Sequence, residues 1–421
     1  MPFDAGVSFL FRPSKIVREI MKITSIEIYD CNVRKKDPAL DYFNPILLRI
    51  NTDEGISGIG EAGLAYGSGS NAAIGILKDL APRLIGADPL RIEAIWEEYY
   101  RGTFWGMSGG PVFYAGMSAI DIALWDIKGK KYGAPIYQLI GGQTNTALRT
   151  YASQLQFGWG PEQTALFDPK EYADAAVKAV SEGYTCLKVD PIQFYGSTKE
   201  ENALSRPRPN YFGLLRREDI QRGYDRLKAM RDAVGPEIDI ILEIHSLLGA
   251  NAAIQFGKAV EELGIYYYEE PTNPMNVDAF ARVADKVDIP VATGERSYTR
   301  WGYRELFEKQ AVAVIQPDAC LVGGITETKK VCDYAAVYHA AVQVHVCGGP
   351  VSTAAALHIE TAIPNFIVHE HHTIATKQSI RELCLYDYQP EGGVFTCPDL
   401  PGLGQELNDA VVKEYLVHTV K

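Results

Sequence analysis

The chain has 421 residues, of which 47% are hydrophobic and 22% are charged, and its formal net charge is −12. This composition is typical of a soluble globular protein, and the length allows two or three domains, or a barrel with an accessory domain. No apolar run approaches the roughly 18 residues that a membrane-spanning helix needs. The acidic balance argues against nucleic acid or an anionic membrane as a partner. The seven cysteines form no C-x-x-C pair, which favours free thiols in a reducing cytoplasm over disulfides or a zinc site.

The first third of the chain divides into an extension and a capping domain. Residues 1–20 lack the basic start and the cleavage site of a signal peptide, and we expect them to be an N-terminal extension. Residues 21–145 are predicted to form a capping domain. Its first half alternates apolar and polar residues, as in an antiparallel meander, over residues 22–33, 44–52 and 57–65. Its second half, residues 71–141, has helical periodicity.

Residues 146–375 alternate short apolar, β-rich runs with helical segments. This alternation favours a parallel sheet with crossover helices, and eight strands in one continuous zone close naturally into a barrel. We expect these strands at residues 149–155, 184–189, 238–243, 265–270, 289–294, 312–316, 342–346 and 365–370. Residues 191–215 are an insertion whose Arg206 and Arg208 could reach the active face. The tail, residues 376–421, is predicted to pack back onto the capping domain.

Six polar residues follow these runs at nearly constant spacing. They are Glu243, Glu269, Glu295, Asp318, His345 and Glu370, with successive gaps of 26, 26, 23, 27 and 25 residues. A strand, a helix and two loops take roughly 25 residues, so each gap matches one βα unit. All six side chains are therefore expected at the C-terminal rim of the barrel, where this fold places its chemistry.

Three acids on neighbouring strands, followed by a histidine, indicate a metal site beside a base. Glu243, Glu269 and Glu295 would supply three carboxylates, and a hard divalent cation such as Mg²⁺ prefers oxygen ligands. The alternative is that strand-end acids simply face solvent, which explains one acid better than three at the repeat spacing. His345 is the candidate base, and Asp318, one strand earlier, is placed to hold it.

Several motifs carry a family resemblance from Met21 onward. They are GGP followed by AGMSAIDIALWDIKGK, then EEP, GER, QPDACLVGGITE, VHVCGGP, AALHIETAIPNF and PGLG. On these motifs the chain resembles the mandelate racemase-like group of the enolase superfamily, and within it the sugar-acid dehydratases of the galactonate and mannonate type. The resemblance implies an α/β fold: a modified TIM barrel, (β/α)7β, with an α+β capping domain built from the N-terminal region and the C-terminal tail. The family usually has Asp where this chain has Glu243.

The resemblance also implies how the reaction would run. His345 would take the proton beside a substrate carboxylate, with one Mg²⁺ per active site neutralising the developing charge. The racemases have Lys-x-Lys on the second barrel strand, whereas this chain has Lys188-Val-Asp190. The missing second lysine disfavours a two-base racemase and favours elimination.

The remaining roles follow from the same resemblance. His245 would protonate the departing hydroxide, or alternatively hydrogen-bond to a metal ligand and support it. Glu370 would hydrogen-bond the substrate carboxylate. Lys188 and Asp190 would pair with each other or contact substrate hydroxyls, and His369 is a candidate for lining the pocket.

The predicted function is a Mg²⁺-dependent acid sugar dehydratase that yields a 2-keto-3-deoxy product. We expect a cytoplasmic homo-oligomer that acts on a small acid sugar, with neither nucleic acid nor membrane as a partner. A racemase or epimerase on the same fold and a catalytically silent binding protein remain alternatives. A zinc-dependent barrel hydrolase would need His-x-His on the first strand, which has no histidine.

Overall fold

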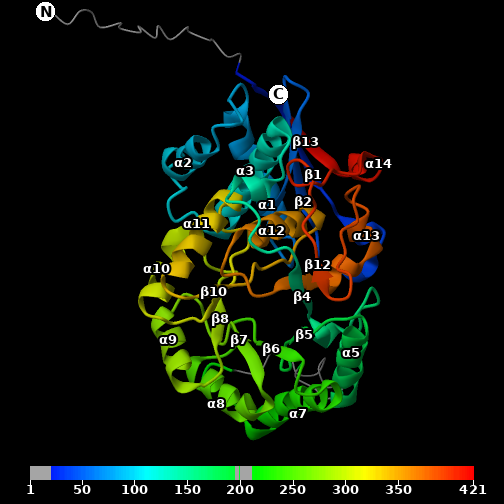
Figure 1. Cartoon of the computed structure of the whole chain (residues 1–421), viewed down its shortest axis with the longest axis vertical. Helices are drawn as coiled ribbons and strands as arrows, with labels where there is room; N and C mark the ends of the chain where they lie inside the picture. The colour runs from blue at the N-terminus through cyan, green and yellow to red at the C-terminus, as the bar shows by residue number, and fades with distance from the viewer. Residues whose placement is uncertain (1–19, 195–198, 200–210) are drawn as a thin grey trace, which may run out of the picture.

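Two β-sheets organise the protein in the computed structural model, which describes residues 20–194, 199 and 211–421. A small antiparallel sheet with its helices forms the upper part of the molecule in Figure 1, and a curled parallel sheet surrounded by helices forms the lower part. The small sheet has the strand order β13-β1-β2-β3. Its strands are β1 (Ile23–Asp30), β2 (Ile46–Thr52), β3 (Ser57–Ala62) and β13 (Leu416–Val420).

The small sheet confirms the predicted meander and the predicted return of the tail. Strands β1, β2 and β3 pair antiparallel in chain order. Strand β13, at the end of the chain, pairs antiparallel with β1, so the cap is built from both ends of the sequence. The helices of this part are α1 (Ser70–Leu80), α2 (Ile92–Gly102), α3 (Gly110–Tyr132) and α4 (Ile136–Leu139).

Helix α3 is buried along most of its length because it lies between the cap sheet and the barrel. Small residues allow this close packing. A Cβ at Gly60 of β3 would lie 1.9 Å from the carbonyl oxygen of Ala119, so only glycine fits there. All ten residues of the segment AGMSAIDIAL are accordingly buried, whereas a surface helix buries one face.

Asp126 of α3 ties the tail to the cap. Its buried carboxylate accepts the backbone N–H of Ile59 in β3 at 3.0 Å and that of Leu403 in the tail at 2.8 Å. It also pairs with Lys130, one helical turn later, at 2.8 Å. The PGLG segment around Leu403 therefore docks on α3 through buried hydrogen bonds, which fix it more firmly than surface contacts would.

The parallel sheet has the strand order β10-β9-β8-β7-β6-β5-β4-β11, and β12 adds to β4 in antiparallel fashion. Its strands are β4 (Leu148–Ser153), β5 (Cys186–Val189), β6 (Asp239–Glu243), β7 (Ile265–Glu269), β8 (Val291–Thr293), β9 (Val314–Ile315), β10 (Ala341–Val342), β11 (His369–His372) and β12 (Val394–Phe395). An isolated parallel bridge between Val342 and Phe366 joins the last two parallel strands, which brings the two ends of the curled sheet together.

Helices follow the strands and cover the outside of the barrel (Figure 1). They are α5 (Pro169–Ser181), α7 (Arg217–Val234), α8 (Ala250–Val260), α9 (Val277–Lys286), α10 (Thr299–Glu308), α11 (Gly324–Val337) and α12 (Pro350–Ala362), with the short α13 (Gln378–Arg381) and α14 (Asp409–Val412) in the tail. The cap lies against the C-terminal ends of the strands, since Gly63 N–H, just after β3, donates to Cys320 O in the loop that follows β9.

The barrel confirms the predicted α/β fold, with differences at individual strands. Asp318 and His345 lie just beyond the ends of β9 and β10, where they form an isolated parallel bridge with each other. The last strand begins at His369 instead of Asn365, because Asn365 and Phe366 form the turn that meets β10. The N-terminal extension and the arginines of the insertion fall in residues 1–19 and 200–210, outside the described part of the chain. The domain boundaries stay predictions. In the described residues no helix has the length and apolarity to cross a membrane.

His358 in the middle of α12 gives the fold a pH dependence. Burial lowers the pKa of this imidazole to about 4, so the unfolded chain takes up a proton at higher pH than the folded protein does. The stabilising contribution is therefore complete above about pH 6.5 and is lost as the pH falls toward about pH 4. At 1.36 kcal/mol per unit, the loss amounts to about 3 kcal/mol.

We therefore expect His358→Asn to flatten the acid side of the stability profile. The unfolding free energy of the unsubstituted protein minus that of the variant should fall by about 3 kcal/mol between about pH 7 and pH 4, measured by urea denaturation. His339→Asn, at an exposed site, is the control and should show a constant difference. A constant difference for His358→Asn would contradict the assignment.

Candidate functional site

A cavity of about 840 Å³ lies where the cap meets the C-terminal ends of the barrel strands. The cap contributes Tyr42, Glu61, Leu64, Tyr66 and Pro111 to its wall. The barrel contributes Gln154, Asp190, His245, Glu295, Arg296, Asp318, His345 and His372 among others. The size and the convergent polar side chains are those of a small-molecule site.

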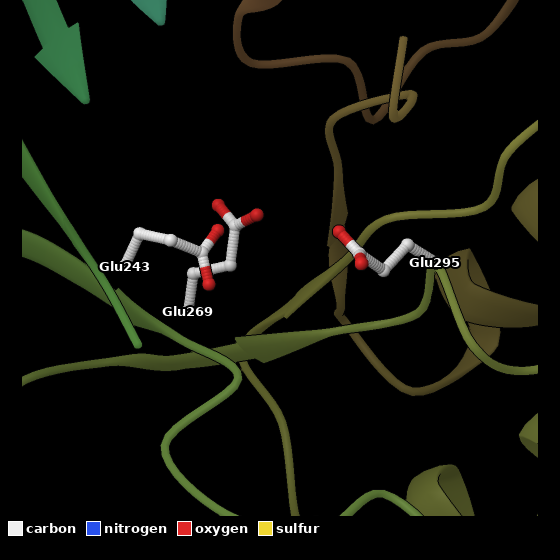
Figure 2. Close-up of side chains that lie close together, drawn as sticks. All are labelled: Glu243, Glu269 and Glu295. Carbon is white, nitrogen blue, oxygen red and sulfur yellow. The ribbon is translucent and has the colours of Figure 1, made fainter. Parts of the chain in front are cut away.

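Three of the predicted residues form one carboxylate cluster. Glu243 ends β6, Glu269 ends β7 and Glu295 follows β8, so three adjacent parallel strands deliver them to the same rim. One oxygen from each lies within 4.8 Å of the others. Figure 2 shows the carboxyl groups of Glu243 and Glu269 side by side and that of Glu295 pointing toward them from the neighbouring strand end.

Glu243 and Glu269 each use one oxygen for support and leave the other without a hydrogen-bond partner. Glu243 Oε1 accepts the backbone N–H groups of Ile244 and His245 at 3.0 and 2.7 Å. Glu269 Oε1 accepts Lys188 Nζ at 2.8 Å. The second oxygens, both Oε2, are buried and accept no hydrogen bond from the described residues. Burying a carboxylate oxygen that has no hydrogen-bond partner costs free energy unless a cation balances its charge. The cluster therefore fits a hard divalent metal ion.

Lys188 lies beneath this cluster. Its side chain is 1% exposed, and its Nζ lies 2.8 Å from Glu269, 2.9 Å from Glu370 and 3.4 Å from Glu243. Burial disfavours the ammonium form, but the three carboxylates outweigh burial and raise its pKa. Lys188 is not among the residues that line the cavity, so the structure does not bring it to a substrate position.

Glu370 on β11 completes the buried charge. Its Oε1 accepts Ser153 Oγ at 2.7 Å, and its Oε2 accepts the backbone N–H of Val346 at 2.9 Å. Burial alone would raise its pKa, but Lys188 and His345 outweigh burial and lower it. By contrast, burial and the neighbouring Glu243 raise the pKa of Glu269 to about 8, although Lys188 acts against them.

His345 and Asp318 form the predicted pair at the mouth of the site. His345 Nδ1 lies 2.8 Å from Asp318 Oδ2, and Nε2 lies 3.2 Å from Glu295 Oε2. Burial alone would lower the pKa of His345, but Glu295 and Asp318 outweigh it and raise the pKa to about 10. Because a carboxylate can only accept, both ring nitrogens carry a proton here, Nδ1 toward Asp318 and Nε2 toward Glu295 in the cluster.

His245 and Asp190 form a second, similar pair on the other side of the cluster. His245 Nδ1 lies 2.7 Å from Asp190 Oδ2, and its Nε2 lies 3.4 Å from Gln154 Nε2. Burial acts against the charged ring, but Glu243 and Asp190 raise its pKa to about 9. His245 and Ser246 have positive φ angles of 49° and 60°, so the chain turns sharply after Glu243 and directs the imidazole into the cavity.

The histidines around Glu370 point to two opposite sides of β11. His369 is fully buried, bonds Glu360 of α12 at 2.5 Å and does not line the cavity. His371 is also buried and contacts Tyr184 OH at 2.6 Å. His372 lines the cavity instead. Alternation along β11 turns Glu370 toward the barrel interior and sends His369 and His371 to its outer face, so the structure does not bring His369 to the site.

Among the cavity residues that the sequence patterns did not indicate are Glu61, Gln154 and Arg296. Glu61 comes from the cap, and its strand, ending GEA, offered no spacing that linked it to the barrel. Gln154 follows β4 with a φ of 68°. Arg296 stands next to Glu295 in the GER motif, and its guanidinium pairs with Glu295 and with buried Glu270. Adjacency to a predicted ligand was the one signal that could have found Arg296.

Comparison with known proteins agrees with this architecture. The mandelate racemase / muconate lactonizing enzyme N-terminal domain model matches residues 42–141, and the enolase C-terminal domain-like model matches residues 171–411. The D-galactonate dehydratase of Ralstonia nicotianae is 31% identical over 376 residues, covering 88% of this chain and 90% of that protein. The arabinonate dehydratase of Saccharolobus solfataricus is 31% identical over 372 residues, covering 88% and 90%.

Solved structures extend the agreement to three dimensions. A protein from Salmonella enterica subsp. enterica serovar Typhimurium is 61% identical, with a TM-score of 0.93 and coverage of 96% of this chain and 100% of that one. An enolase superfamily member from Salmonella Typhimurium is 50% identical, with a TM-score of 0.89 and coverage of 96% and 100%. The chain therefore belongs to the enolase superfamily, in the group defined by mandelate racemase and muconate lactonizing enzyme.

Proposed function

We propose that the protein is a Mg²⁺-dependent acid sugar dehydratase. It would convert a linear six-carbon aldonate, or a related acid sugar, to the 2-keto-3-deoxy acid by removing water. One observation carries the proposal: two histidine–carboxylate pairs, His345–Asp318 and His245–Asp190, line one cavity together with Glu295 of the carboxylate cluster. The dehydratases among its relatives act on galactonate and arabinonate, which are sugar acids of this kind.

Glu243, Glu269 and Glu295 would hold the metal ion. A divalent cation there supplies positive charge that stabilises the negative charge developing on the substrate carboxylate as the adjacent proton leaves. Lys188 and Glu370 would keep the cluster in place from below, because both are buried and make several polar contacts. Arg296 would fix Glu295 from the side through its ion pair.

In its neutral form, His345 would remove the proton from C2 of the substrate. That form requires that the charge of Glu295, the main cause of the raised pKa of His345, be balanced by a cation held at the cluster. Asp318 accepts from its Nδ1, which leaves Nε2 as the nitrogen that faces the cluster and exchanges protons. Asp318 in turn accepts the backbone N–H of Cys320 at 2.7 Å, so the pair is held rigidly. A positioned base of this kind contributes about 10²–10⁴ in rate.

His245 would give a proton to the hydroxide that leaves C3. Asp190 occupies the position of the second lysine in the racemase motif. Its carboxylate lies 2.7 Å from His245 Nδ1 and would hold that ring in place. The second barrel strand would therefore supply Asp190, the partner of the acid His245, at the position where the racemases have a second base. The two histidines approach the cavity from different strands, so only acid sugars with one relative configuration at C2 and C3 should react.

We expect Glu269→Gln to abolish tight Mg²⁺ binding. The substitution removes one of three anionic ligands. Loss of a residue that only supports a metal ligand typically lowers the metal affinity about 10–100-fold, so loss of a ligand itself should raise the dissociation constant by at least about a hundredfold. Calorimetric titration with Mg²⁺ measures this directly, and thermal stabilisation by Mg²⁺ should disappear in parallel. Glu262→Gln, on the exposed face after α8, is the control. Unchanged Mg²⁺ affinity in Glu269→Gln would rule out this ligand set.

The two histidines should separate in an isotope experiment. In D₂O, His345→Asn should stop both dehydration and exchange of the C2 hydrogen with solvent, because no base remains. His245→Asn should reduce dehydration by about 10²–10⁴, the usual contribution of a general acid, while exchange continues. Nuclear magnetic resonance of the recovered substrate measures exchange. The opposite pattern would reverse the two roles.

The reaction itself is tested by a keto-acid assay across aldonates and aldarates, with and without Mg²⁺. A minority of aldonates should yield 2-keto-3-deoxy acids in a Mg²⁺-dependent manner. Failure with every acid sugar, together with racemisation of a smaller 2-hydroxy acid, would favour the racemase alternative.

A further inference from the structure

Two carboxylates of the cap reach the N-terminal ends of barrel helices. Glu61 of β3 accepts the backbone N–H groups of Gly349 and Ser352, the latter at 3.0 Å, at the start of α12. Asp121 of α3 accepts the N–H of Thr326 at 3.0 Å, in the first turn of α11. Both side chains are buried, at 1% and 3% exposure. They differ in one respect: Glu61 lines the cavity and Asp121 does not.

Glu61 fills a place that would otherwise attract anions. The N-terminus of a long helix presents free N–H groups and the positive end of its dipole. At α12 these N–H groups already donate to Glu61, and the backbone comes so close that a Cβ at Gly348 or Gly349 would lie 2.9 or 3.2 Å from Glu61 Oε1. A substrate carboxylate therefore finds the Glu61 carboxyl group at this wall instead of an open helix terminus, and that group is negatively charged when the pH is above its pKa of about 7.

The positive groups of the rest of the wall are already paired with carboxylates, since His345 pairs with Asp318 and His245 with Asp190. The cavity residues within the described ranges include the acids Glu61, Asp190, Glu295 and Asp318, and a single Lys or Arg, which is Arg296. Arg296 is already shared between Glu295 and buried Glu270. A cation held by the carboxylate cluster would then be the unshared attraction for an anionic group at this wall.

We propose that Glu61 is a specificity-determining residue that restricts the cavity to acid sugars with a single carboxylate. This inference rests on the proposed function and narrows its substrate class to aldonates. The C1 carboxylate would lie at the cation. A second carboxylate at C6 of an aldarate would meet Glu61 without a partner, whereas the neutral C6 hydroxyl of an aldonate can donate a hydrogen bond to such acceptors. Repulsion of the wrong ligand is a common source of specificity.

The test compares aldonates with aldarates of the same configuration. Affinities are measured calorimetrically with Mg²⁺ in the His345→Asn background, so that binding is read without turnover. Burial raises the pKa of Glu61 to about 7, although Gly349 and Ser352 act against it, so the measurement is made near about pH 8.5, where the carboxyl group is ionised. Aldonates should bind about thirtyfold more tightly than aldarates, the order of magnitude expected for repulsion between two like charges in one cavity at an effective dielectric constant of ~20.

Glu61→Gln should reduce this preference by about the same factor, chiefly by improving aldarate binding. Asp121→Asn is the matched control: it removes an equally buried carboxylate from the other helix terminus, so it should lose comparable stability and keep the preference. If Glu61→Gln does not fold, the salt dependence of the unsubstituted pocket decides, because a charge-based preference must shrink at high ionic strength. Equal aldonate and aldarate affinity, an unchanged preference in Glu61→Gln, or a preference insensitive to salt would overturn the inference.

The outcomes also separate this inference from the proposed function. If the protein binds aldonates more tightly than aldarates but forms no keto acid from either, the dehydratase proposal is contradicted and the role of Glu61 stands. Keto-acid formation from aldonates and aldarates at similar kcat/KM would support the dehydratase and refute the role of Glu61.

Discussion

A concentration of buried negative charge at the C-terminal ends of the barrel strands is the constraint on which the rest of the structure depends. Glu243, Glu269 and Glu370 are all nearly inaccessible to water and share one buried cation, Lys188. Removing carboxylates from water is expensive unless each is paired. One lysine cannot balance three, so the arrangement makes sense when a further cation is bound among the strand ends.

The neighbouring histidines depend on the same field. His345 contacts Glu295 and His245 is raised in pKa chiefly by Glu243, so both rings belong electrostatically to the cluster as well as to their own aspartates. The charges and orientations of the two rings are therefore coupled to the cluster over a few ångströms. Asp190, at the end of the second barrel strand, supplies the carboxylate that pairs with His245 at 2.7 Å.

The cap takes part in the site as well as covering it. Glu61 and Asp121 each bond backbone N–H groups at the start of a barrel helix, and Gly63 bonds the loop that carries Asp318. The loops that carry Asp318 and His345 are thus held by the cap as well as by the barrel. Specificity and positioning arise at this contact between cap and barrel, where the same carboxylate can stabilise the docking and repel a ligand.

The sequence by itself determined the regular parts of this protein. Spacing of about one βα unit located Glu243, Glu269 and Glu295 correctly, because parallel strands of a barrel all end at one rim. Only the tertiary structure decided which side chains from distant segments meet there. Glu61 reaches α12 across 288 residues of sequence, and Lys188 lies beneath the cluster instead of facing the cavity. His369 bonds Glu360 of α12 on the outer side of β11, away from the cavity. Periodicity records which face of one element is buried, whereas these contacts depend on how separate elements pack, and no local pattern contains that information.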